Sequence, residues 1–168
     1  MKIRLAGLVP ESIVDGPGYR FAVFTQGCPH HCPGCHNPKT HDFTGGYEAD
    51  TDDVIAKIGG NPLVRGVTLT GGEPMMQAGA LCGIAQAAKA KGMNVWCYTG
   101  YTLEELLGEQ NLDRMRLLEY VDVLVDGPYL SHERSLDLLY CGSKNQRLID
   151  MNKTREAGEI RLYEPPVW

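Results

Sequence analysis

Three cysteines stand close together in the segment GCPHHCPGC, at Cys28, Cys32 and Cys35. A disulfide needs two thiols and a structural zinc site usually has four ligands, so three thiols suggest another use. Thiolates also hold iron–sulfur clusters, usually in sets of four. Three cysteines on a four-iron cluster would leave one iron without a protein ligand and therefore able to bind another molecule. Two prolines and two glycines make the segment a tight loop that suits a compact inorganic body.

A zinc site is the alternative that the same loop leaves open. The three cysteines with His31 or His41 as the fourth ligand would form a Cys₃His site. His36 is a poorer candidate, because it adjoins Cys35 and the two side chains would have difficulty reaching one metal.

The segment Thr70-Gly71-Gly72-Glu73-Pro74 is the second signal. Adjacent glycines after a strand let the backbone approach a ligand closely, and the N–H and C=O groups can then bind its polar end. Alone, the motif is equally consistent with a tight strand–helix turn, but beside the cysteine loop it becomes more specific.

Strand-like and helix-like segments alternate along the chain, which predicts a mostly parallel sheet covered by helices. Short apolar segments predict strands at residues 2–7, 20–26, 65–70, 94–99 and 121–125. Helical patterns cover residues 77–91, 102–107 and 112–120, and a further helix runs to about residue 58 from Thr51 as its N-cap. There are too few elements for a closed eightfold barrel, so we expect a partial, open β/α barrel with a curved sheet.

Four polar or glycine-rich clusters follow four of these strands: TQGC, TGGEP, YTGY and VDGPY. The carboxyl ends of parallel strands share one face of a barrel or open α/β sheet, and that face holds the active site. The sequence therefore predicts that the cysteine loop and the other three clusters converge on one site.

The chain of 168 residues is long enough for one domain with a buried core, and we expect a single domain over residues 1–168 with a tail from about residue 151. The tail segment EIRLYEPPVW suits either a last edge strand or a docking segment. A net charge of −5 without a run of Lys and Arg argues against nucleic-acid binding. Neither a signal peptide nor a membrane span is evident, so we expect a cytoplasmic protein.

The remaining cysteines carry weaker signals. Cys82 and Cys97 fall in a predicted helix and a predicted strand, where they suit small core residues. Cys141 is isolated in the sequence and is interpreted as structural.

In combination these motifs resemble those of the radical S-adenosylmethionine superfamily. The segment DGPGYRFAVFTQGCPHHCPGCHNPKTHD resembles the activating enzymes of glycyl-radical enzymes. Four features are similar to the branch that activates anaerobic ribonucleotide reductases: the short chain, PGC before the last cysteine, LVDGPY and GSKNQR. The resemblance spans about residues 15–147. The pair His36-Asn37 is more similar to the pyruvate formate-lyase branch, which keeps an activase of another glycyl-radical enzyme as an alternative.

The resemblance implies a 4Fe-4S cluster on Cys28, Cys32 and Cys35, whose open iron chelates S-adenosylmethionine. It implies that a 5′-deoxyadenosyl radical forms and takes hydrogen from a backbone glycine of the partner. No side chain is expected to act as a catalyst beyond the cluster and the S-adenosylmethionine site. The residues expected to contact S-adenosylmethionine are Gly34, Cys35, His36, Thr70, Gly71, Gly72 and Glu73.

The partner implied is the large glycyl-radical reductase subunit, with an electron donor such as flavodoxin or ferredoxin. Because a glycine inside another protein must reach the cluster, we expect the site face to be open. A zinc-stabilised binding module without redox activity remains the alternative from a different class.

Overall fold

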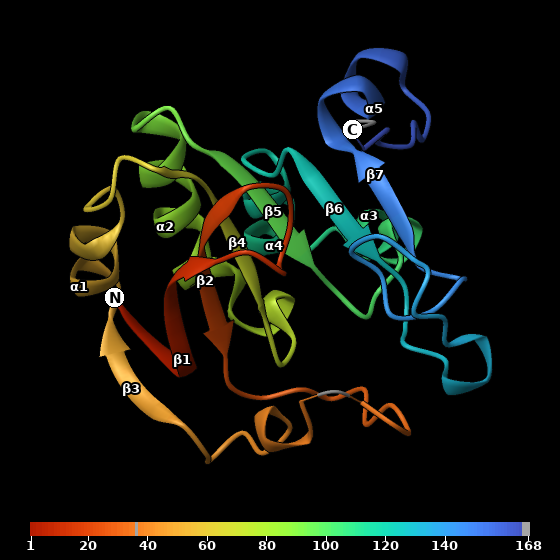
Figure 1. The fold of residues 1–168 in the computed structure, drawn as a ribbon, viewed down its shortest axis with the longest axis horizontal. Coiled ribbons are helices and arrows are strands. Elements are labelled where there is room, and N and C mark those ends of the chain that lie inside the picture. The colour runs from red at the N-terminus through yellow and green to blue at the C-terminus, as the bar shows by residue number, and fades with distance from the viewer. Residues whose placement is uncertain (36, 166–168) are drawn as a thin grey trace.

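The computed structural model describes residues 1–35 and 37–165. Within them, seven strands form one sheet in the order β3-β1-β2-β4-β5-β6-β7 (Figure 1). The strands are β1 (Lys2–Ser12), β2 (Tyr19–Thr25), β3 (Tyr47–Asp50), β4 (Val64–Gly71), β5 (Asn94–Tyr98), β6 (Val123–Asp126) and β7 (Arg147–Asp150).

The centre of the sheet is parallel and its borders are antiparallel. Strands β2, β4, β5 and β6 run in the same direction, whereas β1 and β7 run against their neighbours. The outer strands β3 and β7 stand at opposite ends of the order, so the sheet does not close. The predicted α/β fold with an open, mostly parallel sheet is confirmed.

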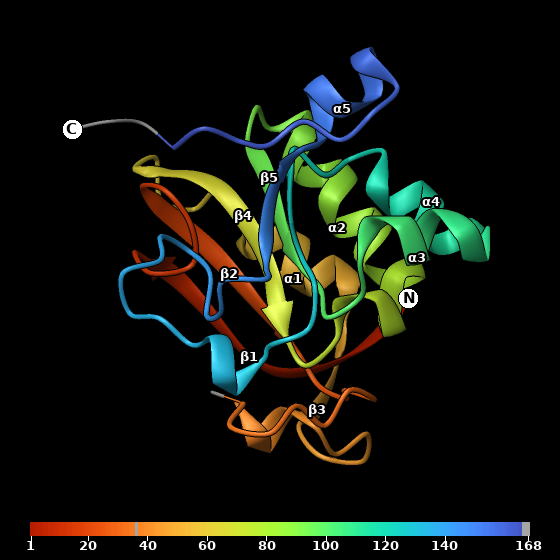
Figure 2. The same cartoon turned by 90° about the vertical axis from the view of Figure 1, so that its right-hand side faces the viewer.

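Helices cover one face of this sheet. The α-helices of the described residues are α1 (Thr51–Lys57), α2 (Ala78–Ala90), α3 (Leu103–Glu109), α4 (Leu112–Leu118) and α5 (Met151–Ala157). Short 3₁₀ turns η1 (Pro38–Thr40), η2 (Pro74–Gln77) and η3 (Ser131–Glu133) lie in the connections. Figure 2 shows α1 to α4 on the same side of the sheet, and α2 contacts both α1 and α4. None of the helices in the described part of the chain has the length and apolarity to cross a membrane.

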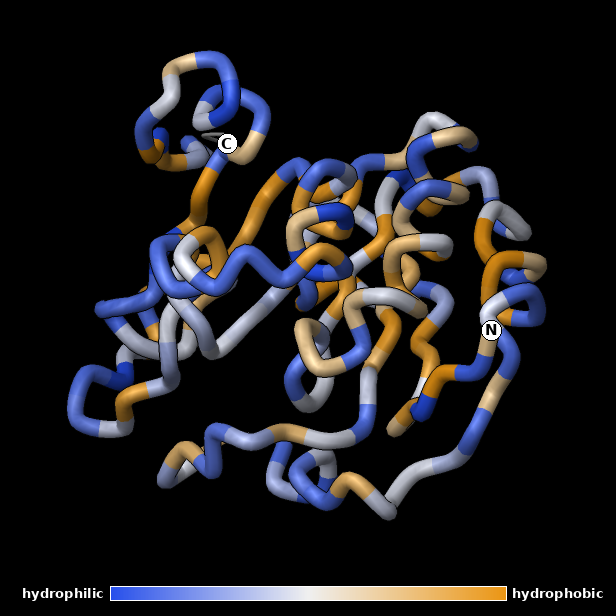
Figure 3. Tube along the Cα trace, turned by 180° about the vertical axis from the view of Figure 1, so that it is seen from behind, coloured by the Kyte–Doolittle hydropathy of each residue, from blue (hydrophilic) through white to orange (hydrophobic). Residues whose placement is uncertain are grey.

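Side chains alternate between the two faces, as the period of a strand requires. On β5, Val95 and Cys97 are buried in the core between sheet and helices, while Trp96 and Tyr98 pack in a second cluster on the other face. Figure 3 shows hydrophobic residues along the central strands and hydrophilic residues over much of the surrounding loops.

A buried arginine joins three strands on the face without helices. Arg20 donates from Nε to Thr68 Oγ1 at 2.7 Å and from Nη2 to the Val67 carbonyl at 3.0 Å. Its guanidinium lies 5.5 Å from the ring centre of Trp96, within the range of a cation–π contact. Burial lowers the pKa of Arg20 to about 10. Arg20 thereby links the amino end of β2 to the middle of β4 and β5.

The prediction of Thr51 as an N-cap is wrong by one residue. Asp50 is the N-cap of α1, and its carboxylate accepts a hydrogen bond from the Asp52 backbone N–H at 3.0 Å. Thr51 is the first helical residue. Thr102, the first residue of the predicted helix 102–107, is the N-cap of α3, and Glu105 completes a capping box with it.

Three elements were not predicted from the sequence: β3, β7 and α5. The edge strands β3 and β7 have four residues each and mostly exposed or half-buried side chains, so they lack a continuous apolar run. Helix α5 directly follows β7, and Asp150 is both the last residue of β7 and the N-cap of α5. The predicted tail segment pairs with β7 at one position, where Leu162 bridges Ile149; residues 166–168 lie outside the described residues.

Asp122, just before β6, connects two helices and a strand. Its carboxylate accepts hydrogen bonds from Lys89 Nζ at 2.7 Å, the Val95 backbone N–H at 2.7 Å and Asn152 Nδ2 at 3.0 Å. Burial alone would raise the pKa of Asp122, but these hydrogen bonds together lower the pKa below its ordinary value. The ionised carboxylate therefore contributes to the stability of the fold.

Replacing this carboxylate by an amide (Asp122→Asn) is expected to lower the free energy of unfolding by about 2 kcal/mol at pH 7, the range for hydrogen bonds to a charged group. The contribution of a carboxylate with a lowered pKa is present above the unfolded-state value of about 3.9 and is lost as the pH falls through the folded-state value. Urea unfolding of both proteins at pH 7, 5 and 3 should show the difference shrinking at pH 3. A difference that stays constant with pH would contradict the role of the ionised group.

Candidate metal centre

The cysteine loop leaves the end of β2 and is closed at its base by backbone hydrogen bonds. The N–H of Gly27 donates to the Thr40 carbonyl at 2.7 Å, and the N–H of Cys28 donates to the His41 carbonyl at 3.1 Å. The two ends of the loop therefore lie side by side, and the residues between them form an arch.

Gln26 holds the returning end of the loop with its side chain. Its amide Nε2 donates to the carbonyls of Lys39 at 2.8 Å and Asp42 at 2.7 Å. Gln26 is buried, so the site is anchored by a side chain that the sequence did not single out.

The three cysteines of the loop are free thiols. Cys28 is buried, whereas Cys32 and Cys35 are half-buried, and the Cys35 N–H donates to the Cys32 carbonyl at 3.1 Å. The backbone N–H of Asn37 donates to Cys35 Sγ at 3.4 Å. All three sulfur-bearing residues line one cavity.

Burial raises the pKa of the Cys28 thiol above its ordinary value. A hydrogen bond from the His30 backbone acts in the opposite direction, and the carboxylate of Glu73 raises the pKa further. A metal must therefore displace a proton from Cys28, since the thiolate is the form that ligates.

The strand ends supply the rest of the cavity wall. Thr70, Gly71 and Gly72 come from the end of β4, and Tyr98, Thr99 and Gly100 come from the end of β5. Residues from beyond β6 complete the wall: Gly127, Tyr129 and Gln146. The predicted convergence of the four clusters on one site is what the structure shows.

The two glycines of the TGGEP segment are needed for packing against the cysteine loop. A Cβ on Gly72 would lie 2.4 Å from the Gly27 carbonyl oxygen and 2.8 Å from the Thr40 carbonyl oxygen. Gly71 has φ +100°, and a Cβ there would lie 2.4 Å from the Thr25 backbone nitrogen. The absence of side chains thus brings the end of β4 directly against the base of the loop.

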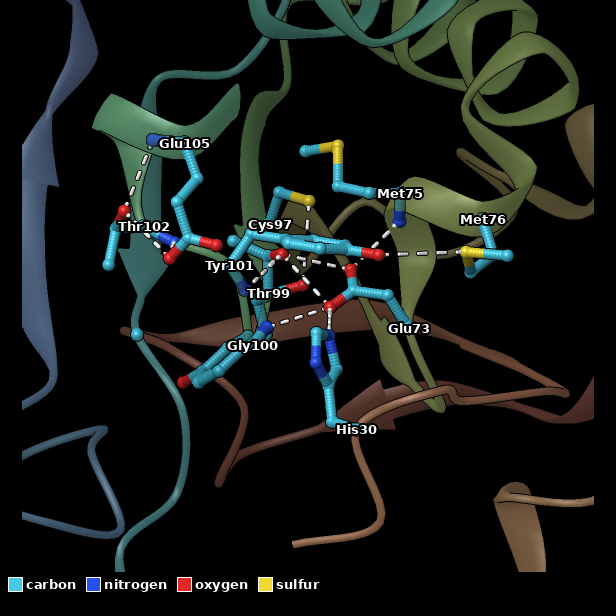
Figure 4. A network of polar contacts seen from close by, with 12 residues as sticks. His30, Glu73, Met75, Met76, Cys97, Thr99, Gly100, Tyr101, Thr102 and Glu105 are labelled. Atoms are coloured by element: carbon cyan, nitrogen blue, oxygen red, sulfur yellow. Dashed lines mark hydrogen bonds and ion pairs between the residues drawn. The ribbon is translucent and has the colours of Figure 1, made fainter. Parts of the chain in front are cut away.

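Glu73 behaves differently from its two glycine neighbours. It is 1% exposed and is not among the residues that line the cavity. Its carboxylate instead meets donors from His30, Met75, Thr99 and Gly100 (Figure 4). In the TGGEP segment, Thr70, Gly71 and Gly72 therefore line the cavity, whereas the Glu73 side chain is buried in the protein interior.

Comparison with known proteins gives a family model and several relatives. Residues 14–149 match the family model described as a 4Fe-4S single cluster domain. The anaerobic ribonucleoside-triphosphate reductase-activating protein of Vibrio cholerae serotype O1 is 37% identical over 145 residues, covering 82% of this chain and 91% of that protein. The proteins of the same name from Escherichia coli strain K12 and Enterobacteria phage T4 are 34% and 33% identical, covering 82% and 84% of this chain and 92% and 90% of theirs.

The chain belongs to the family of anaerobic ribonucleoside-triphosphate reductase-activating proteins. Among solved structures, QueE from Escherichia coli aligns with a TM-score of 0.48 at 22% identity, covering 61% of this chain and 54% of QueE. The assignment to the activating-protein family rests on the sequence relatives and on the cluster-domain model.

The two histidines of the zinc alternative, His31 and His41, differ in exposure. His31 is exposed, while His41 lines the cavity, and the two rings meet edge to face at 5.7 Å. Within residues 1–35 and 37–165, no three His, Cys, Asp or Glu side chains are placed to hold a single metal ion. A four-iron cluster makes a different demand, because each thiolate binds a different iron.

Of the residues predicted to contact S-adenosylmethionine, Cys35, Thr70, Gly71 and Gly72 line the cavity. Gly34 is exposed beside them with φ +75°, and His36 lies outside the described residues.

Several residues of the site were not predicted individually. Thr99 and Gly100 lie in YTGY and Gly127 lies in VDGPY, so their clusters were found but the residues were not assigned roles. His30 was missed altogether, and the only sequence signal was its place between two cysteines.

The close packing of Gly72 can be tested by adding a methyl group there, with Gly83 as the matched control. Gly72→Ala is expected to cost about 2 kcal/mol of unfolding free energy and to impair cluster uptake, because its Cβ would meet two backbone oxygens. Gly83→Ala in α2 has open space at its Cβ and should instead stabilise the protein by about 0.5–1 kcal/mol. Urea unfolding and iron content after anaerobic reconstitution measure both effects. A Gly72→Ala protein as stable and as rich in iron as the wild type would disprove the packing argument.

Proposed function

We propose that this protein is an iron–sulfur, S-adenosylmethionine-dependent activase of the anaerobic ribonucleoside-triphosphate reductase. The observation that carries the proposal is the single cavity lined by Cys28, Cys32 and Cys35 together with the ends of β4, β5 and β6. The three cysteines and the turns at the strand ends line the same cavity. A cluster and an organic cofactor that bind side by side require such an arrangement.

The donor set suits a 4Fe-4S cluster held by three cysteines. All three thiols are free, and the three cysteines line the same cavity. Cys28, Cys32 and Cys35 would hold this cluster, which when bound would supply the electron for reductive cleavage of S-adenosylmethionine and so for removal of a hydrogen atom from a backbone glycine of the reductase. The role of the protein is to bind the cluster and S-adenosylmethionine, to orient them, and to shield them from solvent.

The wall at the end of β4 is the proposed seat for the methionine end of S-adenosylmethionine. Thr70, Gly71 and Gly72 line the cavity, and the two glycines let this wall lie directly against the base of the cysteine loop. The loop at Gly34, Cys35 and His36 is proposed to contact the nucleoside part. Glu73, which the sequence also predicts among these contacts, has a carboxylate occupied by protein donors, so we assign it a role in positioning the wall.

A second cavity supports access for a protein substrate. Its volume is about 520 Å³, and it shares Cys35, Thr70, Tyr98, Tyr129 and Gln146 with the first. The shared residues make the two cavities neighbours along one surface, so a loop of the reductase that entered the second would bring its glycine toward the cluster. The family name of the relatives indicates the reductase as partner. The electron would come from a small carrier such as flavodoxin or ferredoxin.

The proposal predicts cysteine-dependent cleavage of S-adenosylmethionine. The protein is reconstituted with iron and sulfide without air, reduced, and mixed with S-adenosylmethionine and an anaerobic ribonucleotide reductase. Wild type should form 5′-deoxyadenosine and a glycyl radical that electron paramagnetic resonance detects on the reductase. Cys32→Ala should lose both, because one of three cluster ligands is gone.

Cys82→Ala is the matched control, since Cys82 is a buried core thiol on α2 and does not line the cavity. It should retain the cluster and the cleavage activity. A fully loaded 4Fe-4S protein that cleaves no S-adenosylmethionine even with reductase present would refute the proposal. A colourless protein that binds zinc in place of iron would favour the structural zinc alternative.

A further inference from the structure

The side chain of His30 reaches from the cysteine loop to a buried acid. His30 Nε2 lies 2.5 Å from Glu73 Oε1, and the exposed fractions of the two side chains are 18% and 0%. A carboxylate only accepts hydrogen bonds, so Nε2 carries the proton and donates it to Glu73. The contact joins the arch between Cys28 and Cys32 to the end of β4.

The acceptor is itself held rigidly by the body of the protein. Glu73 accepts from the Gly100 backbone N–H at 2.7 Å, from Thr99 Oγ1 at 2.9 and 3.0 Å, and from the Met75 backbone N–H at 3.0 Å. These donors come from the end of β5 and from η2 (Figure 4). Because its position is determined by several bonds outside the cysteine loop, Glu73 can serve as a fixed anchor.

The space around the His30 ring is shaped for it. A Cβ on Gly100 would lie 2.6 Å from His30 Cδ2 and 2.7 Å from Nε2, so the ring occupies the place that any other residue at position 100 would fill. On another side the ring meets Tyr101 edge to face, with centroids 4.6 Å apart. Three neighbours from two loops, Glu73, Gly100 and Tyr101, thus form a seat for one imidazole.

His30 lies between two of the three cysteines, so these contacts of its ring bear on the cysteine loop. His30 is two residues from both Cys28 and Cys32, and its backbone forms a hydrogen bond with the Cys28 sulfur. Its neighbours Pro29 and His31 are exposed, so they do not anchor the arch in the interior. The base of the loop is fixed at Gly27 and Cys28, and His30 provides the anchor farther along.

We propose that His30 is a positioning residue for the cluster, which fixes residues 28–32 at the cavity by seating its ring against Glu73, Gly100 and Tyr101. The inference rests on the proposed cluster at Cys28, Cys32 and Cys35. Partners of metal ligands that act in this way typically change metal affinity or activity 10- to 100-fold when they are replaced.

The test measures how firmly the cluster is held. Wild type and His30→Ala are reconstituted without air, and iron loss to a chelator is followed by visible absorption, with electron paramagnetic resonance of the reduced cluster recorded alongside. His30→Ala is expected to lose iron about 10- to 100-fold faster and to show an altered resonance spectrum. His30→Gln should restore much of the retention, because its amide N–H can donate to Glu73 in place of Nε2.

Two further variants separate positioning from general damage. Gly100→Ala keeps both His30 and Glu73 but places a methyl group where the ring lies, so it should reproduce the faster iron loss. This variant decides the matter if His30→Ala does not fold, as judged by circular dichroism. His31→Asn is the control, since His31 is exposed on the same loop and asparagine tolerates its φ of 48°.

Wild-type iron retention and an unchanged spectrum in His30→Ala or in Gly100→Ala would overturn this inference while leaving the proposed function intact. Equal iron loss in His31→Asn and His30→Ala would also overturn it, because the effect would then belong to the loop in general. A wild-type protein that takes up no cluster at all would overturn the proposed function and this inference with it.

Discussion

The close approach of two backbone segments is the constraint on which the rest of the site depends. The end of β4 lies against the base of the cysteine loop, where the Gly72 N–H donates to the Thr25 carbonyl and the Glu73 N–H donates to the Gly27 carbonyl, both at 2.8 Å. Only residues without a Cβ at 71 and 72 permit this packing. The contact brings the thiols and the turn of β4 to one cavity, and the next side chain, Glu73, lies in the interior.

From that point the interior acid organises the neighbouring loops. A buried carboxyl group must be matched by hydrogen-bond partners, and Glu73 finds them in the cysteine loop, in η2 and at the end of β5. A single side chain thereby couples three segments that are far apart in the sequence. The helices contribute indirectly. They cover one face of the sheet and so help to hold the strands in register.

The general layout could be predicted because it follows from local patterns and one topological rule. Parallel strands bring their carboxyl ends to one edge, so the order of strands and loops was enough to place TQGC, TGGEP, YTGY and VDGPY together. The role of Glu73 could not be predicted in the same way, since its burial depends on Thr99 and Gly100, which lie 26 and 27 residues later. The short strands β3 and β7 escaped prediction because pairing with longer neighbours, and not their own composition, stabilises them.

The unequal burial of the three thiols has a consequence for the order in which the site fills. Cys32 and Cys35 are half-buried at the cavity, whereas Cys28 is 8% exposed and its pKa is raised by burial. Incoming iron and sulfide would meet the two accessible thiols first, and Cys28 would join last, with release of its proton. Without a bound cluster, the two accessible thiols would meet an oxidant before Cys28 does.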